Sequence, residues 1–182
     1  METKIHTSKK LEKLLQKVIQ VDPNKESARL GKWKATLFYV NRKKCLLPAN
    51  ARTQYNVILT DFKTSDLKYI EMRFKVAFYE QLRHDEIEVD ANAVNSIIGN
   101  ITFHKTDNDR KANGFLSYRI QELEYWKSKY ERFENMPFKK ITQGLNGSPT
   151  HIGVGQKMAD YVYSIDEMKK LLGSISNDLK TI

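Results

Sequence analysis

The densest run of side chains able to do chemistry is the heptapeptide HKTDNDR at 104–110. Asp107 and Asp109 are one residue apart, and two carboxylates at such spacing can hold a divalent cation. His104 would act as a general base, and Lys105 or Arg110 would stabilise charge on a phosphate under attack. The segment would then be the centre of a metal-dependent nuclease. We favour the alternative, in which one aspartate caps the following helix, because no second carboxylate cluster completes a metal site.

A second candidate site is the basic segment between Glu26 and Asp61, which contains no acidic residue. We expect six of its cations to contact nucleic acid: Lys32, Lys34, Arg42, Lys43, Lys44 and Arg52. Cationic side chains neutralise phosphates, and exposed aromatic rings stack on bases. The aromatic residues near these cations are Trp33, Phe38, Tyr39 and Tyr55. The alternative is that the charges form only a solvated face and that the rings fill the core.

The remaining reactive residues give no further site. His6, His84 and His151 lack the spacing of a metal-binding motif. Cys45 lies in an apolar segment, which favours a buried structural thiol over a nucleophile. A single cysteine also excludes an internal disulfide and a cysteine-rich zinc site. We therefore predict neither a cofactor nor a bound metal.

The charge of the chain is concentrated in its first part. The 182 residues carry a formal net charge of +9, and residues 1–75 alone hold 17 basic and 7 acidic side chains. A surface of one sign attracts polyanions such as nucleic acid. No apolar run approaches the roughly 18–20 residues that span a membrane, and the first residues lack the apolar stretch of a secretory signal. These features predict a cytoplasmic protein without a membrane partner.

The hydrophobic pattern predicts an α+β fold, in which a small antiparallel sheet of three to four strands packs against several helices. Predicted strands span 33–40, 44–49 and 54–59, with a fourth extended segment at 101–105. Predicted helices span 9–20, 66–83, 90–98, 109–131 and 137–143, and a last helix begins at Ser164. Short connections between the first three strands indicate an antiparallel meander. The glycine-rich residues 144–157 are predicted to form a loop.

The helix predicted over 66–83 has the strongest periodicity. Phe74 and Phe78 lie one turn apart on its apolar face, and we expect both to be buried beneath the sheet with Leu37 and Val57. Beyond Asn135 the signals weaken. Residues 1–135 are therefore assigned to the main domain, and residues 136–182 to a helical appendage packed on it.

The segment LGKWKATLFYVNRKKCLLPAN at 30–50, followed by YNVIL at 55–59, resembles a family of small bacterial domains of unknown function. The shared pattern is an L-G-x-W strand, an R-[RK]-K-C hairpin and a leucine-rich return strand that ends in Asn. The matching residues are Leu30, Gly31, Trp33, Arg42, Lys43, Lys44, Cys45, Leu46, Leu47 and Asn50. Residues 104–126 resemble the second block of the family, a turn that leads into a helix. The resemblance implies one compact bacterial α+β domain and no particular activity.

The sequence is compatible with three functions. The first is a non-enzymatic module that contacts DNA or RNA through its basic sheet and hairpin. The second is a metal-dependent nuclease or toxin-like protein with His104, Asp107 and Asp109 in its active site. The third is an interaction module whose basic face meets an acidic protein.

Overall fold

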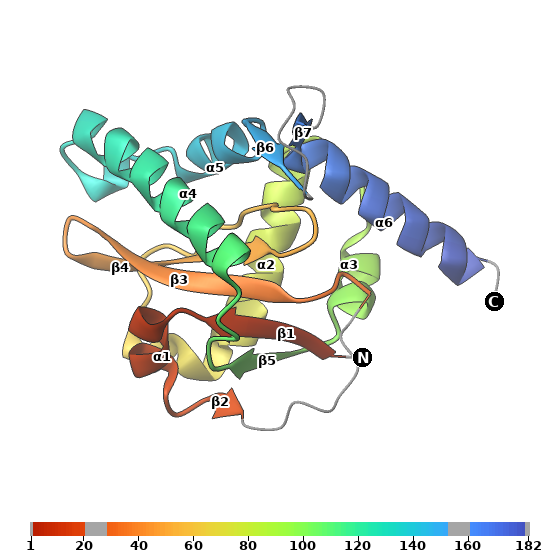
Figure 1. The fold of residues 1–182 in the computed structure, drawn as a ribbon, viewed down its shortest axis with the longest axis horizontal. Coiled ribbons are helices and arrows are strands. Elements are labelled where there is room, and N and C mark those ends of the chain that lie inside the picture. Colours follow the sequence, from red (N-terminus) through yellow and green to blue (C-terminus); the bar gives the residue numbers. More distant parts are fainter. Residues whose placement is uncertain (1, 21–28, 153–160, 181–182) are drawn as a thin grey trace.

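A mixed five-stranded sheet runs through the middle of the molecule and carries helices on both faces (Figure 1). The computed structural model describes residues 2–20, 29–152 and 161–180. In sheet order the strands are β2 (Ile19–Gln20), β5 (Asn100–His104), β1 (Glu2–Thr7), β3 (Trp33–Val40) and β4 (Lys43–Asn50). The predicted α+β class is confirmed. The sheet has more strands than predicted. Its β3–β4 pair is antiparallel, whereas β1 runs parallel to both β3 and β5, and β5 also runs parallel to β2.

The central strand β1 has no counterpart among the predicted strands. Its sequence, ETKIHT, contains one apolar residue, Ile5, so its hydrophobic pattern gives little signal. Ser8 then caps α1 (Lys9–Leu15), and its Oγ accepts the backbone N–H of Leu11 at 3.3 Å. The helix predicted over 9–20 is therefore too long, since the chain turns into β2 before Gln20.

The β3–β4 hairpin forms as predicted. Asn41 and Arg42 at its tip both have left-handed backbones, with φ of 46° and 67°, which is typical of a two-residue hairpin turn. Pro48 lies within β4 and pairs with Ala35. Because β4 is an edge strand, the missing N–H of this proline interrupts no further ladder.

The third strand predicted at 54–59 is wrong. This segment makes only two isolated bridges to β4, Leu46 to Leu59 and Ala49 to Asn56. The backbone of Gln54 is left-handed, with φ of 57°, and the N–H of Asn56 donates to the side chain of Asn146 at 2.7 Å. A side-chain amide from a distant helix thus takes one bond that a strand partner would have made.

The predicted helices are present with shifted ends. The structure has a 3-10 turn η1 (Thr64–Tyr69), α2 (Ile70–His84), α3 (Ala91–Ile98), α4 (Arg110–Lys129), a short η2 (Phe133–Asn135), α5 (Phe138–Asn146) and α6 (Ser164–Lys180). A two-stranded sheet of β6 (Pro149–His151) and β7 (Tyr161–Tyr163) accompanies them. The loop predicted over 144–157 is therefore wrong at 144–146 and 149–151, and its residues 153–157 lie outside the described part of the chain.

Two apolar clusters fill the spaces on either side of the sheet. The first holds Trp33, Leu37, Val57, Phe74 and Phe78, so the predicted burial of both phenylalanines is confirmed. The second lies between the opposite face of the sheet and α4 and α5. Side chains of α6 join the first cluster, and the predicted domain boundary at residue 135 stays a prediction. Within the described residues, no helix is long and apolar enough to cross a membrane.

Candidate functional site

The basic segment and the 104–110 turn, predicted as separate sites, meet in the structure. Lys34 forms an ion pair with Asp107, and the Nζ of Lys32 lies 3.0 Å from Oδ2 of Asp107 and 3.6 Å from Oδ2 of Asp109. The side chain of Lys34 is only 4% exposed. We call these four residues the Lys–Asp cluster. Its two positive and two negative charges cancel. The lysines therefore offer no free charge to a phosphate, and the aspartates offer none to a metal ion.

The ionisation of the Lys–Asp cluster follows from these contacts. Burial raises the pKa of Asp107, but hydrogen bonds from Lys34 and Lys32 outweigh it and hold that pKa far below its usual value. The pKa of Asp109 is also lowered, and the hydrogen bond from the N–H of Ala112 is the largest cause. The hydrogen bond to Asp107 raises the pKa of Lys32. Asp107, Asp109 and Lys32 are consequently charged at neutral pH.

One of the two aspartates caps the following helix, as predicted. The N–H of Ala112 donates to Oδ1 of Asp109 at 3.2 Å, and Asp109 is the N-cap of α4. Asp107 instead directs its carboxylate to Lys34 of β3 and to Lys32, the residue before this strand. The cap follows from local sequence, whereas these two ion pairs join residues 73 and 75 positions apart.

Replacing Asp109 by alanine is expected to lower the free energy of unfolding by about 1 kcal/mol, because the first turn of α4 loses its side-chain acceptor. Asp109→Asn keeps an oxygen acceptor and should recover most of this loss. Urea denaturation followed by circular dichroism measures both variants. Equal losses for alanine and asparagine would contradict the capping role.

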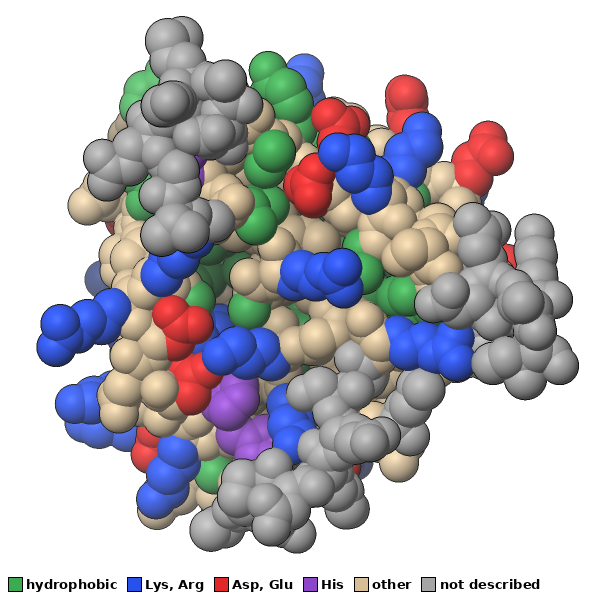
Figure 2. Space-filling view, turned by 45° about the vertical axis from the view of Figure 1, so that its right-hand side comes forward, with side chains coloured by type: hydrophobic (Ala, Val, Ile, Leu, Met, Phe, Trp, Pro, Cys, Tyr) green, Lys and Arg blue, Asp and Glu red, His purple; other side chains and the backbone are tan. Residues whose placement is uncertain are grey.

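His104 lies in a different environment from Asp107 and Asp109. It ends β5, and its Nε2 is 2.9 Å from Oγ1 of Thr102 and 3.9 Å from Oε1 of Glu2. The ring of His6 lies alongside, 5.6 Å between centroids, and its Nδ1 is 3.0 Å from the carbonyl of Lys105. Figure 2 shows histidine side chains between basic and acidic ones on this face. Within the described residues no three potential ligands form a metal-binding group.

The remaining predicted contacts to nucleic acid are spread over the molecule. Lys43 in the hairpin lies 2.9 Å from Glu134 and 3.7 Å from Asp61, and its ammonium faces the ring of Phe133. Arg42 is exposed at the hairpin tip, and Lys44 is half-buried. Arg52 is exposed just beyond the other end of β4. The eight residues of β4 span roughly 27 Å at about 3.4 Å per residue, so these cations do not form one patch.

The aromatic residues near the basic segment do not form an open stacking surface. Trp33 and Tyr55 are fully buried in one cluster, and Phe38 is buried in the other. Only Tyr39 is partly exposed, with the Nζ of Lys10 5.0 Å from its ring centroid. Helices on both faces of the sheet account for this burial.

The structure contains a pocket, lined by both polar and apolar side chains, that the sequence did not reveal. It lies between α1 and α4 and has a volume of about 440 Å³. Its lining residues are Ser8, Lys9, Lys10, Thr36, Leu37, Thr106, Asn108, Asn113, Leu116, Ser117 and Ile120. We call it the α1–α4 pocket. Two lysines, four hydroxyl groups and two amides line it together with apolar residues, and no acidic side chain is among them.

The position of this pocket follows from the parallel pairing of β1 and β5. Because both strands run in the same direction, the segments that follow them emerge at the same edge of the sheet. One brings Ser8 and Lys9, and the other brings Thr106 and Asn108. Ligands of sheets with parallel strands commonly bind outside such carboxyl ends. The sequence could have pointed here only if 2–7 had been predicted as a strand.

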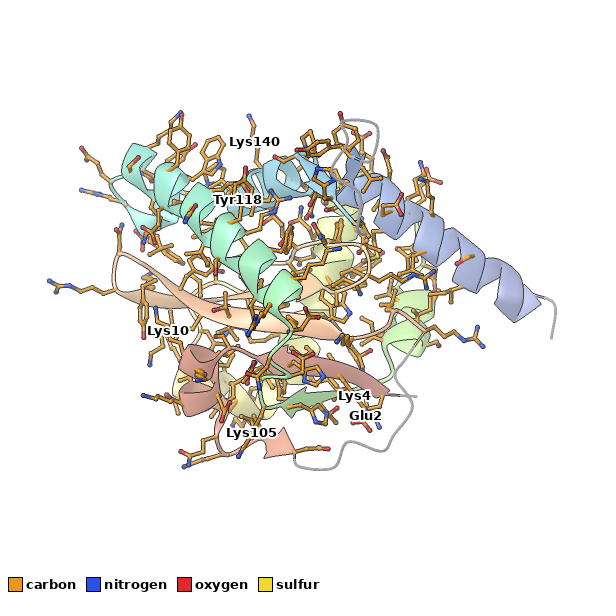
Figure 3. All side chains as sticks on the ribbon, viewed as in Figure 1. Glu2, Lys4, Lys10, Lys105, Tyr118 and Lys140 are labelled. Carbon is orange, nitrogen blue, oxygen red and sulfur yellow. The ribbon has the colours of Figure 1, made fainter. Side chains whose placement is uncertain are left out.

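Two further cations lie on or near α1. Lys13 and Lys105 are exposed and line a second pocket, which also contains Glu12. Figure 3 shows Lys10 and Lys105 close to α1. We call Lys9, Lys10, Lys13 and Lys105 the α1 basic surface.

Comparison with known proteins gives a family but no activity. No curated protein matches the chain. The family model of a domain of unknown function, DUF6933, matches residues 4–167. The match extends from β1 into α6 and includes both blocks of the predicted resemblance. This chain therefore belongs to the DUF6933 family of domains of unknown function.

Proposed function

We propose that this protein is a nucleic-acid-binding module that holds phosphate groups in the α1–α4 pocket and along the α1 basic surface. The observation that carries the proposal is the composition of the pocket, which combines two lysines with neutral donors and contains no acidic side chain. Its volume of about 440 Å³ falls in the usual range for ligand sites, about 300–1,000 Å³.

The chemistry of the pocket suits a phosphodiester. Lys9 and Lys10 supply ammonium groups at its rim, and hydroxyl and amide groups donate to phosphate oxygens without adding negative charge. The side chains of Ser8 and Thr36 are already joined, 2.9 Å apart, which fixes both hydroxyl groups in the pocket wall. Leu116 and Ile120 add an apolar surface on which a sugar or base can rest.

One partly exposed aromatic ring lies close to these donors, because Tyr39 is beside Lys10. Stacking on such a ring contributes about 1–3 kcal/mol per base and tolerates any sequence. This site differs from the one predicted from the sequence, because Lys32, Lys34 and Lys43 are paired with carboxylates while Lys9 and Lys10 line an acid-free pocket.

Reversing the charge of the pocket lysines, in the double variant Lys9→Glu and Lys10→Glu, is expected to weaken binding of a 20-nucleotide single-stranded RNA about tenfold at low salt. Removing two phosphate contacts should also reduce the slope of log K against log salt by about 1.4, since each contact contributes about 0.7 for single strands. Fluorescence anisotropy at four salt concentrations measures both quantities. Acidic residues in the first turn of α1 favour the helix, so folding should be preserved.

The matched control is Lys169→Glu with Lys170→Glu, two adjacent exposed lysines on α6. This variant has the same net charge and should bind nearly as tightly as the parent protein. Equal weakening in both variants would mean that only net charge matters and would refute the site. Cleavage of the RNA that requires Mg²⁺ would instead favour the nuclease hypothesis.

A further inference from the structure

A second and larger depression lies between α2 and α5, on a different part of the molecule from the α1–α4 pocket. Its volume is about 620 Å³. Apolar side chains form much of its surface, including Ile58, Val76, Met136 and Phe138. We call it the α2–α5 groove. The groove lies beside the segment that follows the edge strand β4. The α1–α4 pocket lies elsewhere, because α1 packs near the middle of the sheet.

The wall that α2 contributes to this groove is unusually apolar for an exposed helix face. Met72 is 58% exposed and Val76 is 49% exposed, and both line the groove. These two residues are one helical turn apart, and Tyr69, 49% exposed, continues the same stripe. Contiguous apolar surface of this kind, bordered by charged residues, is typical of an interaction site.

The border of the groove carries one cation beyond its ion pairs. Lys139, Lys140 and Arg73 line it, together with one acidic residue, Glu80. Lys139 lies 3.0 Å from Glu80, so that pair is neutral, and Arg73 pairs with Asp66. Lys140 is exposed on α5, where Figure 3 labels it.

We propose that the α2–α5 groove binds an amphipathic helix of a partner protein whose apolar face is flanked by Asp and Glu residues. Two facing helices with an apolar floor form the receptor of a helix-in-groove complex, which buries apolar anchors at i, i+3 or i+4, and i+7. The exposed Lys140 at the border favours acidic flanks by charge complementarity. A second copy of this chain fits less well, because it would bring the same lysine and a net charge of +9 to this face.

The probe is a fluorescein-labelled 16-residue helical peptide with leucines at i, i+4, i+7 and i+11 and glutamates at its flanking positions. Its partner probe keeps the leucines and replaces every glutamate by lysine. The acidic peptide is expected to bind at least tenfold more tightly in fluorescence anisotropy. Val76→Glu should weaken this binding at least tenfold, and Lys140→Glu about threefold. Lys169→Glu on α6 is the matched control and should have no effect.

Several results would overturn the proposal. They are no binding of the acidic peptide at 1 mM, equal binding of the two peptides, or a concentration-dependent dimer that Val76→Glu dissociates, which would show that a second copy fills the groove. Val76→Lys provides a second variant if Val76→Glu unfolds, as its melting temperature would show. RNA binding should be unchanged in both Val76 variants, so failure of this inference is distinguishable from failure of the nucleic-acid proposal.

Discussion

Phe74→Ala is expected to lower the free energy of unfolding by about 3–5 kcal/mol, the usual cost of truncating a large aromatic side chain in a packed core. The Phe74 side chain is 1% exposed. Its ring meets that of Trp33 edge-to-face, with centroids 5.1 Å apart, and stacks against Phe78 at 6.1 Å. Removing it leaves a cavity where α2 packs on the sheet. A loss of this size is a large part of the 5–15 kcal/mol that stabilises a typical domain.

Urea denaturation followed by tryptophan fluorescence and circular dichroism measures this change, and Trp33 reports on the same contact. Met72→Ala, two residues away on the exposed face of α2, is the matched control. Its effect should stay within about 0.5 kcal/mol, as for surface substitutions in general. A loss below 1 kcal/mol for Phe74→Ala would show that α2 does not pack on the sheet as described.

Asp107→Ala is expected to lower the free energy of unfolding by about 2–3 kcal/mol at neutral pH, because a buried ammonium loses its carboxylate. Lys34 is the group left behind, since its side chain is 4% exposed and its remaining carboxylate, Asp109, lies 4.0 Å away. Replacing both partners, Asp107→Leu with Lys34→Met, removes the uncompensated charge. The double variant should therefore be more stable than Asp107→Ala.

The pH dependence of this effect has a definite sign. The pKa of Asp107 in the folded protein is lowered from 3.8, so its contribution to stability is present above about pH 4 and is lost as the pH falls toward its folded value. The difference in melting temperature between the parent protein and Asp107→Ala, measured from pH 7 to pH 2, should therefore shrink toward the acidic end. A constant difference across this range would show that the carboxylate of Asp107 is not paired in the folded state.

Buried Asp85 acts in the opposite direction. Burial raises its pKa, although the hydroxyl of Tyr55 donates to it at 2.6 Å and the amide of Asn146 at 3.0 Å. A raised pKa means that ionising this carboxylate costs stability as the pH rises above its unfolded value. The loss of stability at acidic pH that we assign to Asp107 must therefore be measured as the difference between the parent protein and Asp107→Ala, because the parent protein alone also reports on Asp85.

Local features of this protein could be predicted from its sequence. The spacing of Phe74 and Phe78 predicts the buried face of α2, because helical periodicity needs only neighbouring residues. The cap of α4 at Asp109 is equally local, since donor and acceptor lie three residues apart. The hairpin tip at Asn41 and Arg42 follows from the short polar link between two apolar strands.

Only the tertiary structure decided how distant segments meet. The segment ETKIHT became the central strand because β3 and β5 satisfy its backbone on both sides, although Ile5 is its one apolar residue. This pairing brings Lys9 and Asn108 to one pocket and leads the 104–110 turn back across β3, where Asp107 neutralises Lys32 and Lys34. The sequence alone determined which charges the chain carries. Which of them are free to bind a partner depends on contacts such as those of Lys34 and Lys32 with Asp107, 73 and 75 positions apart, for which local patterns hold no information.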